Sequence, residues 1–126
     1  MKPKEIGIVA AVCLMILSAL ASPAWADRSA VTIEVPGTAQ KGSETVIRLT
    51  VTHSGNSSFH HTQWVALKVN GKEVQRWEYS SSNLPSSNRF SVEYKIAVTE
   101  PLEVIAEASC NMHGSAGPAK ATVRIQ

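Results

Sequence analysis

The stretch RFSVEYKIAVTEPLEVIAEASC, residues 89–110, decides the fold class of this chain. Apolar and polar side chains alternate along residues 89–98 and again along residues 102–110. A period of two puts one face of a strand in the core and the other in water, so each run predicts a half-buried β-strand. Cys110 ends the second run on its apolar face, and we expect its side chain to point with the core residues.

The same alternation recurs on both sides of this stretch, and no helical periodicity competes with it. Asn70 and Gly71 separate two of the runs and favour a two-residue type I′ hairpin, because both central positions of that turn take positive φ. With the two strands above, seven short strands predict an all-β, immunoglobulin-like antiparallel β-sandwich. The further strands are expected at residues 31–35, 45–53, 64–69, 72–79 and 119–125.

The N-terminus has the three parts of a secretory signal peptide. Lys2 and Lys4 precede an apolar run, and residues 24–26 (AWA) give the small-x-small pattern that a signal peptidase reads. We expect residues 1–26 to be cleaved, which leaves a mature domain of residues 27–126. A retained membrane anchor is the alternative, but the apolar run is short for a span of roughly 20 residues. The prediction is therefore a periplasmic or otherwise exported protein that is not held at a membrane after cleavage.

The charge balance is close to neutral. The whole chain has 12 basic and 10 acidic side chains, and without Lys2, Lys4 and Glu5 ten and nine of them remain. No basic stripe indicates a nucleic-acid partner. One hundred residues suffice for a single core and exclude a second domain, while a homo-oligomer is compatible with the sequence.

The mature chain would carry one cysteine, Cys110, so no internal disulfide is expected. A lone thiol in an oxidising compartment is a liability unless it is buried, paired with another chain or bound to a metal. All four histidines lie at expected strand ends or in the loops beside them, namely His53, His60, His61 and His113. Imidazole and thiolate are ligands that iron, copper and zinc favour. The sequence therefore predicts one metal ion from the histidines taken together, although each histidine taken singly is better explained as a surface or core residue.

The sharpest local motif is CNMHG at residues 110–114. Two intervening residues let Cys110 and His113 converge across a turn that Gly114 permits. His60 and His61 are adjacent, so on a regular strand they face opposite ways and only one is expected to bind the ion. A nucleophilic Cys/His pair is a further alternative, but no acidic residue is placed to orient the histidine.

These features together resemble the iron domain of superoxide reductases, the neelaredoxin and desulfoferrodoxin family. The resemblance covers nearly the whole mature chain. It rests on Lys41-Gly42, on His53, on His60 four residues before Trp64, on VNGK at residues 69–72, and on the CNxHG motif at residues 110–114. It implies a mononuclear non-haem iron, with superoxide reduced to hydrogen peroxide by electrons from an external donor protein. In that reading Cys110 is the axial thiolate, and the planar imidazoles include His53, His60 and His113.

The chain departs from the resembled pattern at its first histidine. The family has a Glu-Lys-His run before the first strand, where this chain has DRS at residues 27–29, so Ser29 stands in place of a ligand. We expect three histidines plus water at the iron; substitution by His61, or a changed metal or lost catalysis, are the alternatives. Arg28 is the expected counterpart of the family lysine that attracts the anion.

Two other functions fit the same residues. Blue-copper electron-transfer proteins also have a cysteine and a histidine separated by two residues, but their axial methionine would fall near Pro118, and Met112 is poorly placed. A non-catalytic iron or redox-sensing module is the other alternative, motivated by Ser29. Copper is therefore the alternative cofactor to iron.

Overall fold

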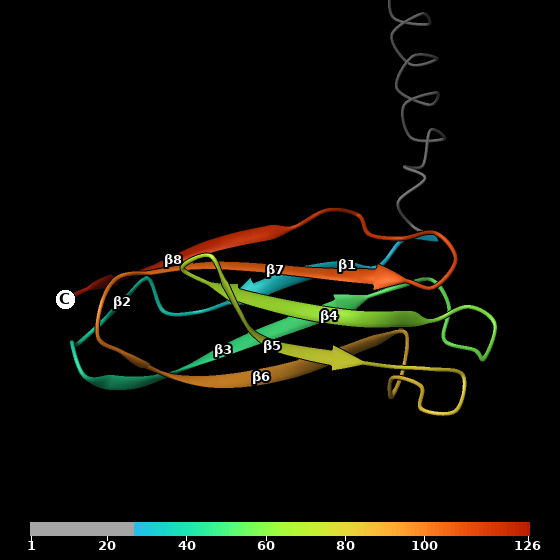
Figure 1. Ribbon diagram of the computed structural model, residues 1–126, viewed down its shortest axis with the longest axis horizontal. Helices are drawn as coiled ribbons and strands as arrows, with labels where there is room; N and C mark the ends of the chain where they lie inside the picture. Colours follow the sequence, from blue (N-terminus) through green and yellow to red (C-terminus); the bar gives the residue numbers. More distant parts are fainter. Residues whose placement is uncertain (1–26) are drawn as a thin grey trace, which may run out of the picture.

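The computed structural model describes residues 27–126, and the predicted signal peptide lies outside them. These residues form eight strands (Figure 1). The strands are β1 (Ala30–Glu34), β2 (Thr38–Ala39), β3 (Ser43–Thr52), β4 (Thr62–Val69), β5 (Lys72–Glu78), β6 (Arg89–Val98), β7 (Leu102–Cys110) and β8 (Ala119–Ile125). Within residues 27–126, no helix has the length and apolar character needed to cross a membrane.

The strands are arranged in two sheets. One sheet has the order β1-β3-β6 and the other the order β2-β8-β7-β4-β5. All neighbouring strands are antiparallel except β2 and β8, which pair in parallel. The chain passes between the sheets after β1, β2, β3, β5 and β6, so the two layers are tied together at both ends (Figure 1).

The predicted all-β sandwich is confirmed, and the strands at 89–98, 102–110 and 119–125 have the expected bounds. The structure differs by one added strand, β2, which makes eight strands and one parallel pair. Two residues are too few to show an alternation, so no pattern in the sequence indicated β2. The strand expected at 45–53 ends one residue earlier, which leaves His53 as the first residue of a loop.

The core lies between the sheets and explains the alternation. Ile47, Leu49 and Val51 of β3 are fully buried, and they face Val65 and Leu67 of the other sheet's β4, which are also fully buried. Burying each such side chain contributes roughly 1.5–3 kcal/mol. The sandwich is therefore held by apolar packing along its length rather than by the ion pairs on its surface.

The hairpin between β4 and β5 has the predicted turn. Asn70 and Gly71 have φ values of 51° and 83°, as a type I′ turn requires. The Asn70 side chain also accepts a hydrogen bond from the Glu103 amide at 2.8 Å. This turn therefore fixes the register of β4 against β5 at the end of the sandwich opposite to His53.

Tyr79, directly after β5, packs edge-to-face on Phe90 with a centroid separation of 5.3 Å. Burial raises the pKa of the Tyr79 phenol above its ordinary value of 10.0. The aromatic pair closes the core where β5 leaves the sheet.

Candidate metal centre

Two loops meet at the end of the sandwich to which the arrows of β3 and β7 point in Figure 1. Asn111 joins them, because its backbone amide donates to the His61 carbonyl and its side-chain oxygen accepts from the His61 amide, both at 3.0 Å. The Asn111 side-chain amide also donates to the Phe59 carbonyl at 3.1 Å. Asn111 thus sets the distance between the loop of residues 53–61 and the turn that follows β7, a role that the sequence did not reveal.

Three of the predicted ligands converge at this junction. Among residues 27–126, one potential ligand atom from each of His53, His60 and Cys110 lies within 4.8 Å of the other two. The His53 and His60 rings meet edge-to-face with a centroid separation of 4.5 Å. Residues far apart in the sequence therefore offer two imidazoles and one thiol to a common point.

His113, a further predicted ligand, does not belong to this group but lies beside His60 on its exposed side. Its Nδ1 lies 3.2 Å from Nε2 of His60, and the two rings meet edge-to-face. Two nitrogens bound to one ion at right angles, each about 2.1 Å from it, would be about 3 Å apart. The observed separation is thus compatible with His60 and His113 as neighbouring ligands.

The contacts of His53 prepare it for metal binding. This side chain is buried, its backbone amide donates to the Asn88 carbonyl, and its Nδ1 lies 2.6 Å from the Gly55 carbonyl. A neutral imidazole has one N–H, and donating it to Gly55 leaves a lone pair on Nε2. Metal-binding histidines are oriented in this way, with the second nitrogen donating to a carbonyl or carboxylate.

His60 is held by the tight turn of its own loop. Its backbone amide donates to the Ser57 carbonyl and hydroxyl, and the Ser57 amide donates to the His60 carbonyl at 2.8 Å. The ring packs on Gly55, where an added Cβ would lie only 2.8 Å from its Nδ1. The absence of a Cβ at Gly55 therefore lets the ring sit against the loop backbone.

Cys110 presents a buried sulfur whose thiol donates to Oδ1 of Asn111 at 3.7 Å. The residue is 3% exposed, and the Met112 amide donates to Sγ at 3.4 Å. The turn closes through paired backbone bonds between Cys110 and Gly114 at 2.9 and 3.2 Å, and Gly114 has a φ of 77° that favours glycine. An amide directed at sulfur stabilises negative charge there, so this donor set fits a transition-metal ion.

His61 points elsewhere. It is buried, and its Nδ1 lies 2.9 Å from the Ser57 carbonyl. It does not belong to the group formed by His53, His60 and Cys110. The structure therefore gives His61 a role in holding the loop, and its substitution for the absent histidine stays a prediction.

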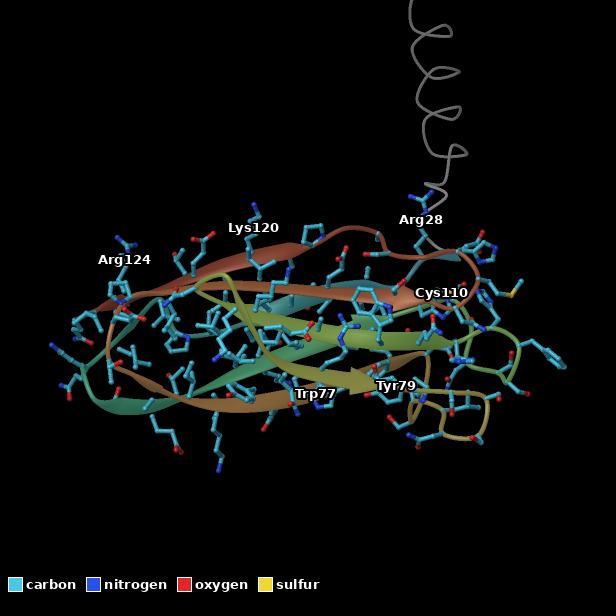
Figure 2. All side chains as sticks on the ribbon, viewed as in Figure 1. Arg28, Trp77, Tyr79, Cys110, Lys120 and Arg124 are labelled. Atoms are coloured by element: carbon cyan, nitrogen blue, oxygen red, sulfur yellow. The ribbon has the colours of Figure 1, made fainter. Side chains whose placement is uncertain are left out.

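Residues 27–29, where the chain lacks the first histidine of the resembled family, lie beside the site. Ser29 is fully buried, and its hydroxyl lies 2.7 Å from that of Thr62. Its amide donates to the Gly114 carbonyl, and its carbonyl accepts from Ala116. Arg28 is exposed, with its side chain directed away from the strands in Figure 2, whereas Cys110 lies at the end of β7. The predicted role of Arg28 in attracting an anion stays a prediction.

A family model described as desulfoferrodoxin matches residues 26–115. The chain belongs to the desulfoferrodoxin family. The match includes every histidine and the cysteine of the site, which agrees with the resemblance read from the sequence. No curated protein sequence matches the chain.

Solved structures agree on the fold. A superoxide reductase (neelaredoxin) from Ignicoccus hospitalis superposes with a TM-score of 0.67 at 18% identity, covering 83% of this chain and 89% of that one. A variant neelaredoxin from Archaeoglobus fulgidus in the reduced form gives 0.57 at 19% identity, covering 79% and 92%. The CARDB domain of a Pyrococcus furiosus protein, in complex with di-metal ions, gives 0.59 at 12% identity, covering 78% and 87%. The sandwich is thus shared with a domain of another name, so the fold alone does not assign an activity.

Proposed function

We propose that the mature chain is an exported superoxide reductase-like protein that binds one iron through Cys110, His53, His60 and His113. The observation that carries the proposal is the convergence of His53, His60 and Cys110, three family-type donors, within 4.8 Å in a chain of this family. The chemistry that ferrous iron supplies at this position is transfer of one electron to superoxide, and two protons from solvent complete hydrogen peroxide.

The protein's own groups set the conditions for that reaction. Cys110 contributes negative charge and electron density, and the Met112 amide adjusts both through its hydrogen bond to sulfur. When Nδ1 of His53 donates to the Gly55 carbonyl, Nε2 carries the lone pair that a metal needs. Buried His53 and Cys110 form the inner side, while exposed His113 marks the side from which a small anion and an electron donor gain access.

The donor is a separate protein in this proposal. Residues 27–126 contain no cysteine besides Cys110, and therefore no thiolate cluster for a second iron centre of the rubredoxin type. A periplasmic location follows from the predicted signal peptide, which supplies the compartment but not the identity of the donor.

The test is a single-turnover experiment. Mature protein loaded with iron and reduced is mixed with superoxide, and the loss of superoxide is followed together with hydrogen peroxide and dioxygen. We expect one hydrogen peroxide per iron and no dioxygen from the reaction at iron. A reduced iron centre that leaves the rate of superoxide loss unchanged would refute the activity while leaving metal binding intact.

Copper is the second candidate, because the group of His53, His60 and Cys110 is a two-histidine, one-cysteine set of the kind that blue-copper sites use. Against it, Met112, the methionine of the same turn, is 62% exposed. Metal analysis of protein purified from an exporting host separates the two: iron supports the reductase, and copper with an intense thiolate band supports electron transfer.

A further inference from the structure

One contact in the site joins it to the first residue of the predicted mature chain. Nε2 of His53 lies 3.2 Å from the carbonyl oxygen of Asp27. If Nδ1 donates its hydrogen to the Gly55 carbonyl, which is the closer of the two at 2.6 Å, then Nε2 carries a lone pair. This lone pair faces a lone pair of the Asp27 carbonyl oxygen. A cation placed between Nε2 of His53 and the Asp27 oxygen could bind both lone pairs. The backbone of Asp27 therefore lies at the edge of the space where a metal would be held.

This placement is fixed from the following residues. Ser29 is fully buried, donates from its amide to the Gly114 carbonyl at 3.3 Å and accepts from the Ala116 amide at 2.9 Å. Gly114 is in turn bonded to Cys110 by a backbone pair. Asp27 thus lies two residues before Ser29, which is hydrogen-bonded to the turn that carries Cys110.

Removal of residues 1–26 changes the chemistry at Asp27. Before cleavage its nitrogen is a peptide amide, which has no lone pair to offer a metal; afterwards it is an amine, which does. That nitrogen is three covalent bonds from the carbonyl oxygen beside His53, hence under about 4 Å from it. Nothing precedes the amine in the mature chain, so it can turn towards His53 without disturbing Ser29.

We propose that the α-amino group of Asp27, freed by removal of the signal peptide, is a further nitrogen ligand of the metal held by His53, His60 and Cys110. The proposal rests on the metal site of the proposed function and extends it. The ligand set is then completed only in the processed protein, so the precursor binds metal more weakly than the exported chain. Metal loading is thereby coupled to export.

Three proteins test this. The mature protein starting at Asp27 is compared with a form that retains Ala26, which converts the Asp27 nitrogen to an amide, and with an Asp27→Asn form that keeps the amine and removes the carboxylate. Each is titrated anaerobically with Fe²⁺ against a competing chelator. Separately, acetylation of the N-terminal amine by acetic anhydride is followed by mass spectrometry with and without Fe²⁺.

We expect the mature and Asp27→Asn proteins to bind Fe²⁺ with equal affinity. The form retaining Ala26 should bind at least about 10-fold more weakly, because even changes to groups that only orient a ligand cost 10-fold to 100-fold. Fe²⁺ should slow acetylation in the first two proteins and leave it unchanged in the third. An amine that is acetylated equally fast with and without bound Fe²⁺ would overturn the proposal and leave the His/Cys site standing. Weakening by Asp27→Asn alone would also overturn it, in favour of the carboxylate. Absence of Fe²⁺ binding in all three would overturn both the proposal and the metal site.

Discussion

The two ends of the sandwich are built on different principles. At the end with the Asn70-Gly71 hairpin, the connections are short and carry charged residues such as Lys41 and Glu100. At the other end, residues 53–61, 79–88 and 111–118 contain no Asp, Glu, Lys or Arg, and they carry all four histidines. The first end is formed by local turn chemistry, whereas the second depends on bonds between distant segments.

The bonds at the site end span long stretches of chain. Asn111 bonds to His61, Ser29 to Thr62, and Asn56 to the Pro85 carbonyl at 2.8 Å. Loops joined in this way can hold metal-binding side chains without a packed core beneath them, because hydrogen bonds to distant segments fix the loop backbone. The difference teaches that stability resides mainly in the body of the sandwich and metal binding in the loops of the histidine-bearing end, so the two should be separable by mutation.

The largest effect should come from Cys110→Ala. This change removes the only thiol of the mature chain, and we expect iron affinity to fall by more than about 100-fold, since even changes to supporting groups cost 10-fold to 100-fold. Metal titration measures the loss, with Ser109→Ala as the neighbouring control. Unchanged affinity in Cys110→Ala would remove the sulfur from the site.

Leu67→Ala should lower the stability of the fold and leave the affinity for iron unchanged. Leu67 of β4 is fully buried, so its truncation should lower the free energy of unfolding by about 2–5 kcal/mol. Denaturant unfolding measures this loss, and exposed Lys68→Ala should change little. We expect the folded fraction of Leu67→Ala to bind iron as the unchanged protein does; a large drop in its affinity would show that the two ends are not separable.

His61→Ala distinguishes a loop support from a ligand. It removes the bond to the Ser57 carbonyl and opens a buried space, and we expect it to cost about 1–3 kcal/mol of stability while leaving the optical spectrum of the iron form unchanged. His53→Ala is the matched comparison and should alter that spectrum. If His61→Ala alters it equally, then His61 is a ligand and the loop rearranges when metal binds.

Gly55→Ala should give the smallest effect and the most local one. The added Cβ would lie 2.8 Å from Nδ1 of His60, so the ring must shift. We expect iron affinity to fall about 10-fold with little change in unfolding free energy, and Gly37→Ala, where no atom lies within 4 Å of the added Cβ, serves as control. An equal loss in both variants would mean that the ring position does not limit binding.

The body of the sandwich was predictable because its signal is local. Alternation placed the strands at 89–98 and 102–110 with their observed bounds, and Asn70-Gly71 placed a turn whose φ values are as expected. The two-residue β2 was not predictable, since its pairing with β8 is a contact between the two ends of the chain. Local patterns carry no information on such contacts.

The site was predictable as a set of residue types but not as a geometry. The sequence indicated that only one of His60 and His61 would face the ion, and the structure turns His61 towards Ser57. It did not indicate Asn111 as the link between loops or Asp27 as a neighbour of His53, because both depend on how distant loops cross. The CNxHG motif contained Asn111 without showing which atoms it would bind.

The most direct test of the central claim is X-ray absorption at the iron edge of the loaded mature protein. The account predicts one sulfur at about 2.3 Å and nitrogens at about 2.1 Å, the ordinary bond lengths for thiolate and imidazole on such ions. A shell of nitrogen and oxygen alone, with no sulfur, would contradict the claim that Cys110 and the histidines bind a common iron.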